Sequence, residues 1–185
     1  MGHAFPTADF GNTCDSVSVS PYISACGYDA AGEILKNFYA DLNPKVAAQT
    51  GNYFWISQSA PGVRSLQSLS LAERAILYVP QTCQNGEPCR LHTVFHGCRQ
   101  TLADIGYSFV TSLGYNSWAE SNNIIILYPQ AVKSQWPYNP RGCWDWWGYS
   151  GTAYHTRTGA QMQVIKKLID RVSRPGFRAT EKVQF

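Results

Sequence analysis

Residues 90–100 read R-L-H-T-V-F-H-G-C-R-Q, in which an apolar strand (90–95) runs directly into a His-Gly turn. Residues 124–128 read I-I-I-L-Y, and a continuous apolar run of this length is typical of a strand whose sheet is covered on both faces. Apolar residues recur at helical spacing over Ala103–Glu120, between the two strands. A strand, a helix and a second buried strand in this order predict an α/β sheet.

The flanking sequence continues the same alternation. Further helices are predicted over Tyr28–Leu42 and Thr158–Val172, and further strands near 53–57 and over Ala75–Pro80. This alternation favours parallel neighbouring strands. We expect one unit over residues 1–172, with an irregular, disulfide-stapled start (1–27) and a poorly ordered tail (173–185).

Length and composition exclude several classes of protein. At 185 residues the chain is long enough for one domain, and its 15% charged residues are few against the roughly 25% of soluble domains. The net charge of +3 is spread thinly, without a basic tract, so a nucleic acid partner is not expected. The longest apolar run, Ile124–Tyr128, is far too short to cross a membrane.

Six cysteines without C-x-x-C spacing favour disulfides formed in an oxidising compartment. Closure of short loops favours the pairs Cys14–Cys26 and Cys83–Cys89, which leaves Cys98 with Cys143. The sequence does not choose among the fifteen possible pairings, and six reduced, buried thiols are the alternative.

The start of the chain conflicts with export. Met1-Gly2-His3-Ala4-Phe5-Pro6-Thr7 lacks the basic start and the apolar run of a signal peptide. Either the protein is not exported, or its true N-terminus lies upstream of Met1.

Two segments carry residue types that suit ester hydrolysis. Many α/β hydrolases build half of their oxyanion hole from a strand that runs into a His-Gly turn, as this strand does at His96-Gly97. In such a turn the backbone N–H of Cys98 would face the developing alkoxide. The pair Gly2-His3, followed by an aromatic residue and a proline, offers an imidazole that could activate a serine hydroxyl. The alternatives are a plain turn at the strand end and a terminal or tag histidine.

A third segment, N-P-R-G-C-W-D-W-W-G-Y over residues 139–149, is dense in aromatic side chains. Trp144, Trp146 and Trp147 beside a disulfide could wall a groove for an apolar polymer. A well-packed corner of the core is an equally good interpretation for any one of them.

Together these segments resemble the extracellular poly(3-hydroxybutyrate) depolymerases of the circularly permuted, single-domain type. The resemblance covers about residues 2–172 and rests on G-H-A-F-P-T, F-H-G-C-R-Q, the stretch from Gly114 to Ala131, and the aromatic segment with the following T-G-A-Q-M. It implies a permuted α/β-hydrolase-type sheet with flanking helices. It also implies His3 as general base, Cys98 N–H as oxyanion donor, and Trp144, Trp146 or Trp147 as a substrate wall.

The sequence departs from this family in one respect. Family members carry a G-x-S-x-G nucleophile elbow and then an aspartate, both upstream of the histidine, and residues 1–185 contain no G-x-S-x-G. The nearest approach, from Gly148 to Thr152, follows the aromatic segment rather than a strand, so Ser150 is a poor nucleophile candidate. We therefore expect the C-terminal portion of a catalytic domain, incomplete at its N-terminus and inactive alone, with the missing N-terminal segment as a partner.

Other chemistries are less well supported. His92 and His96 sit four residues apart on a strand, about 13 Å, which is too far for one metal ion without a bend. His155 is interpreted as a solvated loop residue, and Cys98 as a disulfide cysteine rather than a nucleophile. No metal or other cofactor is expected.

We thus expect a secreted serine esterase that cleaves poly(3-hydroxybutyrate) or hydroxyalkanoate oligomers. The alternatives are a catalytically dead remnant that binds polyester through its aromatic residues, and a related esterase acting on feruloyl or acetyl esters.

Overall fold

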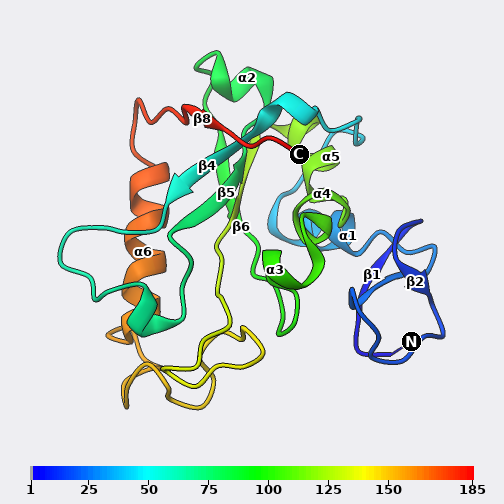
Figure 1. The fold of residues 1–185 in the computed structure, drawn as a ribbon. Coiled ribbons are helices and arrows are strands. Elements are labelled where there is room, and N and C mark those ends of the chain that lie inside the picture. Colours follow the sequence, from blue (N-terminus) through cyan, green and yellow to red (C-terminus); the bar gives the residue numbers. More distant parts are fainter. Residues whose placement is uncertain (1) are drawn as a thin grey trace.

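The computed structural model describes residues 2–185 and contains two sheets (Figure 1). The main sheet has five strands in the order β6-β7-β5-β4-β8, and a separate small sheet has the order β1-β3-β2. The strands are β1 (Phe5–Thr7), β2 (Asn12–Thr13), β3 (Ile23–Ala25), β4 (Tyr53–Ser57), β5 (Arg74–Tyr78), β6 (Arg90–Thr93), β7 (Ile124–Tyr128) and β8 (Glu181–Lys182). The α-helices are α1 (Ala30–Phe38), α2 (Gln81–Gln84), α3 (Leu102–Ile105), α4 (Ser108–Thr111), α5 (Tyr115–Asn122) and α6 (Ala160–Val172), and short 3-10 turns lie at Thr50–Asn52 and Gln67–Leu69.

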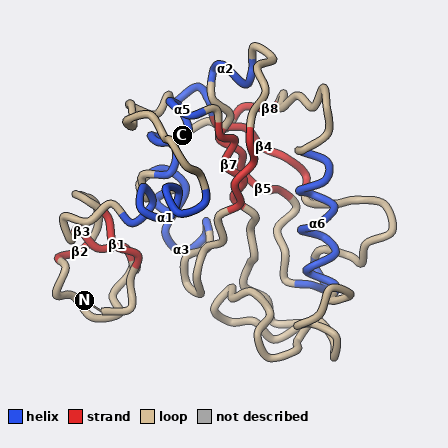
Figure 2. The backbone as a smooth tube through the Cα atoms, turned by 180° about the vertical axis from the view of Figure 1, so that it is seen from behind, coloured by secondary structure: helices blue, strands red, loops and turns tan. Residues whose placement is uncertain are grey.

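Helices cover both faces of the main sheet (Figure 2). Side chains alternate between the faces, so Ile76 and Tyr78 pack with residues of α1, α4 and α5, whereas Leu77 packs with Leu168 and Val172 of α6. This three-layer arrangement confirms the predicted α/β fold, and it explains why β7 is apolar along its whole length.

The strand directions differ from the expectation of parallel neighbours. In the main sheet only β6 and β7 run parallel, while β5 is antiparallel to both β4 and β7, and β8 is antiparallel to β4. Parallel strands need a crossover connection, and α3, α4 and α5 supply one between β6 and β7. The segment between β4 and β5 contains only one 3-10 turn, so the chain returns antiparallel.

The single helix predicted over Ala103–Glu120 is wrong, because the segment forms the three short helices α3, α4 and α5. Gly106 follows α3 with φ +57°, and Gly114 precedes α5 with φ +95°. These backbone conformations lie outside the right-handed helix and are favourable for glycine, so they end one helix and begin another. The apolar spacing is retained because all three helices pack apolar residues against the same face of the sheet, with those of α3 only partly buried.

The C-terminal tail is ordered, contrary to the sequence expectation. Residues of β8 extend the main sheet beside β4, Val183 is buried in the core, and the ring of Phe185 packs edge-on against Tyr53 and Tyr107. Phe177 and Ala179 pack against the core on the α6 side of the sheet, and burial of these apolar residues together with Val183 fixes the tail.

The start of the chain forms the small parallel sheet, which lies beside the main body (Figure 1). The structure confirms all three favoured disulfides, Cys14–Cys26, Cys83–Cys89 and Cys98–Cys143. The first of these closes the small sheet. Within residues 2–185, no helix has the length and apolar character needed to cross a membrane.

Candidate active site

A cavity of about 810 Å³ is lined by two parts of the chain that are distant in sequence. Its lining includes His3 from the loop before β1 and Cys98 from the loop after β6. Residues 92–95 also line it, and β6 is an edge strand of the main sheet, so the cavity lies along a free sheet edge. Arg99 and Arg141 contribute positive charge, and the described lining includes no carboxylate.

We call residues 97–100 the donor loop. Of the four backbone N–H groups in this loop, that of Cys98 has no acceptor among the described residues. The N–H of Gly97 donates to Oε1 of Gln100 (2.8 Å), that of Arg99 to the carbonyl of Arg141 (2.7 Å), and that of Gln100 to the carbonyl of Gly97 (3.2 Å). Among the described residues, no acceptor faces the N–H of Cys98. A free backbone donor beside a cavity is the feature that an oxyanion hole requires.

The buried ring of His96 contacts the donor loop, and both of its nitrogens are hydrogen-bonded. It is buried, its Nδ1 lies 2.8 Å from the carbonyl of Gly97, and its Nε2 accepts the N–H of Ala131 at 3.1 Å. The tautomer is thereby fixed, with Nδ1 as the donor. Burial lowers the pKa of His96, so the ring is neutral and acts as a brace between β6 and the loop after β7.

His92 is also a packing residue. Its ring stacks on Tyr115 and meets Phe38 and Tyr39 edge-on, and burial lowers its pKa. Across residues 2–185, no group of three or more histidine, cysteine, aspartate or glutamate side chains is arranged to hold a metal ion. His155 is exposed on a loop.

His3 is exposed at the mouth of the cavity. The turn that carries it is closed by the N–H of Ala4, which donates to the carbonyl of Gly2, and the chain then enters β1. The N–H of Phe5 donates to the carbonyl of Tyr22, so the position of His3 depends on how β1 lies beside the segment that leads into β3.

The structure separates the three tryptophans of the aromatic segment. Trp144 is half-buried, and its Nε1 donates to the carbonyl of His96, so it packs beneath the donor loop. Trp146 and Trp147 are exposed and, together with Cys98, line a second cavity of about 230 Å³. Trp144 therefore braces the loop, whereas the other two face open space.

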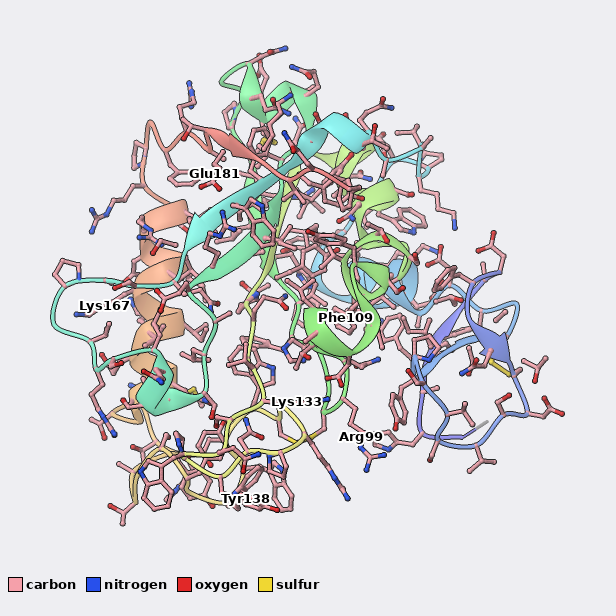
Figure 3. The ribbon with its side chains drawn as sticks, in the orientation of Figure 1. Arg99, Phe109, Lys133, Tyr138, Lys167 and Glu181 are labelled. Atoms are coloured by element: carbon pink, nitrogen blue, oxygen red, sulfur yellow. A yellow bond between two sulfur atoms is a disulfide. The ribbon has the colours of Figure 1, made fainter. Side chains whose placement is uncertain are left out.

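Sequence reasoning missed two further aromatic residues of this surface. Trp136 is 88% exposed and Tyr138 is 65% exposed, and both line a groove that also includes Trp147. Figure 3 shows Tyr138 on the loops at the opposite end of the molecule from Glu181. The run W-P-Y over residues 136–138, directly before the aromatic segment, was the available signal. We call Trp136, Tyr138, Trp146 and Trp147 the aromatic surface.

Two relatives in sequence are similar to most of this chain. A poly(3-hydroxybutyrate) depolymerase from Delftia acidovorans is 42% identical over 175 residues, which are 92% of this chain and 34% of the relative. A polyhydroxybutyrate depolymerase from Talaromyces funiculosus is 41% identical over 178 residues, 88% of this chain and 51% of the relative. The chain is similar in sequence to poly(3-hydroxybutyrate) depolymerases. It spans about a third to a half of the length of these relatives.

Solved structures show the same similarity. The crystal structure of a PHB depolymerase from Penicillium funiculosum superposes with a TM-score of 0.80 at 37% identity, over 91% of this chain and 56% of that chain. A serine-to-alanine variant of a PHB depolymerase, complexed with an R3HB trimer, gives a TM-score of 0.78 at 38% identity. No family model matches the sequence.

The serine nearest to a depolymerase-type elbow has a structural role. Ser150 is buried, and its hydroxyl donates to Oδ2 of Asp145 at 2.6 Å. The backbone N–H groups of Trp147, Gly148, Tyr149 and Ser150 donate to the same carboxylate. Asp145 therefore organises the loop that follows Trp144, and the Ser150 hydroxyl is bonded to a carboxylate rather than to an imidazole base.

This loop gives the chain an acid-sensitive element. Burial acts to raise the pKa of Asp145, but the hydrogen bonds from the Ser150 hydroxyl and the backbone outweigh it, so the pKa lies below its ordinary value. A lowered folded-state pKa stabilises the fold above the unfolded value of about 3.9 and loses that contribution as the pH falls through the folded value. Asp145→Asn is therefore expected to cost about 2 kcal/mol of unfolding free energy at pH 7 and less at pH 3.

Urea unfolding at the two pH values measures this difference. Asp170→Asn is the matched control, because Asp170 forms an exposed pair with Lys166 one turn away on α6, worth about 0.5 kcal/mol or less. Equal losses for the two variants at pH 7 would contradict the role assigned to Asp145.

Proposed function

We propose that this chain provides the base and an oxyanion donor of a secreted serine-type polyester hydrolase. In this proposal His3 is the general base, the N–H of Cys98 is the donor, and the nucleophilic serine and its acid partner lie outside residues 1–185. The observation that carries the proposal is that His3 and the one unoccupied N–H of the donor loop line the same cavity.

The reaction then follows ordinary serine esterase chemistry. His3 takes the proton of the serine hydroxyl as its oxygen attacks the ester carbonyl, and the carbonyl oxygen becomes an alkoxide held by the N–H of Cys98. The protonated His3 returns the proton to the departing alcohol, which leaves an acyl-enzyme. Water, deprotonated by His3, releases the hydroxyacid product and restores the serine.

The free edge of β6 is where the missing serine would enter. An unpaired edge strand offers a row of backbone donors and acceptors to another strand. A strand paired there would end beside the cavity that residues 92–95 share with His3 and Cys98. The described lining holds no carboxylate, which fits an acid residue supplied from the same outside segment.

The substrate class follows from the relatives together with the surface. Both curated relatives are named for polyhydroxybutyrate, and one solved depolymerase holds an R3HB trimer. The aromatic surface of this chain presents apolar rings to solvent, as binding to an apolar polymer requires. The three disulfides fit a protein that works outside the cell.

Labelling with a fluorophosphonate probe tests the proposal. Residues 1–185 alone are compared with an extended chain, in which the unmatched half of the Talaromyces funiculosus relative is joined ahead of Met1. Intact mass is expected to show one adduct, with hydrolysis of a short p-nitrophenyl ester, on the extended chain only. An adduct on residues 1–185 alone would show that they contain a nucleophile and would overturn the assignment.

The aromatic surface also favours a second candidate, a polyester-binding module without catalysis. The same experiment separates the two functions. An extended chain that stays unlabelled and inactive while residues 1–185 still sediment with polyhydroxybutyrate granules would favour the binding module.

A further inference from the structure

We infer that Gln100 is a positioning residue that couples the donor loop to the segment carrying His3. The inference rests on the proposed function for its catalytic meaning, but the structural coupling can be measured without activity. The two parts of the cavity belong to different sheets, so a defined geometry between them requires a connection.

The side chain of Gln100 makes three hydrogen bonds to backbone groups. It is 7% exposed. Its Oε1 accepts the N–H of Gly97 at 2.8 Å, while its Nε2 donates to the carbonyls of Pro21 (3.1 Å) and Tyr22 (3.2 Å). One amide group therefore bonds to both sides of the cavity.

The bond to Gly97 determines which backbone donor is left for substrate. Because Oε1 occupies the Gly97 N–H, only the Cys98 N–H of the donor loop has no protein acceptor among the described residues. Gly97 is required for this contact, since a Cβ there would lie 2.9 Å from Oε1 of Gln100. A side chain at position 97 would push the amide away and loosen the turn.

The hydrogen bonds from Gln100 to Pro21 and Tyr22 connect the donor loop to the segment that carries His3, which we call the histidine side of the cavity. The carbonyl of Tyr22 accepts a hydrogen bond from Nε2 of Gln100 and another from the N–H of Phe5, two residues after His3. The donor loop and the start of β1 are thus both hydrogen-bonded to the carbonyl of Tyr22. Arg99 adds an exposed bond from its guanidinium to the Tyr22 hydroxyl, and Figure 3 shows Arg99 extending from the main body toward the small sheet.

Glutamine is suited to this task because it offers an acceptor and a donor at the end of one side chain. A glutamate at this position would keep an acceptor for Gly97 but would place a carboxylate against two carbonyl oxygens. Methionine has nearly the same length and offers neither a strong donor nor a strong acceptor. Gln100→Glu should therefore break the histidine side of the link alone, and Gln100→Met should break both sides.

Gln58 provides a matched control. It is fully buried, its Nε2 donates to the carbonyls of Ala72 and Gln130, and its Oε1 accepts the N–H of Gln130. The bonding pattern is the same, but Gln58 does not line the cavity. Gln58→Glu therefore reports the general cost of disturbing a buried glutamine in this fold.

Amide hydrogen exchange of residues 1–185, measured by NMR, is the first test. Gln100→Met is expected to raise the exchange rates of the Gly97 and Phe5 amides about tenfold. Gln100→Glu is expected to raise that of Phe5 while Gly97 stays protected. Gln58→Glu should change neither amide beyond the effect of its global stability. Unchanged exchange at both amides in Gln100→Met would overturn the inference, whatever the catalytic function.

Kinetics of the extended chain provide the second test. A loosened donor loop is expected to lower kcat about 10- to 100-fold, because small displacements of catalytic groups have effects of this size, with KM changed less than about threefold. Gln58→Glu should retain kcat per folded molecule. Changes in exchange at Gly97 and Phe5 without any loss of kcat would show a purely structural link and would overturn the positioning role. An extended chain without activity would count against the proposed function and leave the exchange test intact.

Discussion

His3→Gln is expected to lower kcat/KM of the extended chain for ester hydrolysis by about 10⁴-fold or more. Loss of the base or of its correct tautomer has effects between roughly 10⁴ and 10⁶ in serine hydrolases. The substitution is structurally mild, since His3 is exposed on a loop and its imidazole makes no hydrogen bond with the described residues. The loss should therefore appear in kcat with little change in unfolding free energy.

His155→Gln is the control for this experiment. His155 is also exposed on a loop, but it does not line the cavity. Steady-state kinetics with a soluble ester and thermal unfolding of both variants give the comparison. If His3→Gln retains a rate within about tenfold of the parent, another group is the base, and the role given to His3 is wrong.

Removal of the Cys98–Cys143 disulfide is expected to have the largest effect on stability. The cysteines are 45 residues apart, and the chain-entropy relation for a loop of this length gives about 4 kcal/mol. The Cys98→Ala, Cys143→Ala double variant keeps the backbone N–H at position 98. Any fall in kcat of the folded variant therefore reports the position of the donor loop, not the loss of a reacting group.

The Cys83→Ala, Cys89→Ala double variant is the internal comparison. Its loop spans a separation of only 6 residues, for which the same relation gives about 2 kcal/mol. Urea unfolding of both variants without reductant should give the larger loss for the pair at 98 and 143, and only that pair should affect kcat. Equal losses of stability and activity would show that the longer bridge has no special role in the site.

Much of the layered fold is predictable from local patterns. The apolar run at β7 and the spacing of apolar residues along α6 occur at the predicted places, within two residues at each end. The disulfides followed from loop closure in two cases and from the remaining pair in the third. Each of these inferences needs only residues that are near in sequence or few in number.

The errors arise where a distant partner decides the outcome. The split into α3, α4 and α5 depends on two glycines whose conformations the apolar spacing does not reveal. The order of the tail depends on Val183 and Phe185 reaching a core built from the middle of the chain. The sequence does not distinguish Trp144 from Trp147. In the structure Trp144 donates to the carbonyl of His96 and is half-buried, whereas the ring of Trp147 is exposed.

The sequence by itself determined the α/β class, the resemblance to poly(3-hydroxybutyrate) depolymerases and the two candidate groups His3 and Cys98, and it favoured the correct cysteine pairs. Side-chain type, local periodicity and motif order are sufficient for these properties. The tertiary structure alone decided that the two groups share a cavity, that the Cys98 N–H is the donor left without a protein acceptor among the described residues, and that Gln100 joins the two sides. The link through Gln100 consists of hydrogen bonds between segments about eighty residues apart, and such bonds depend on the packing of the whole chain rather than on any local pattern.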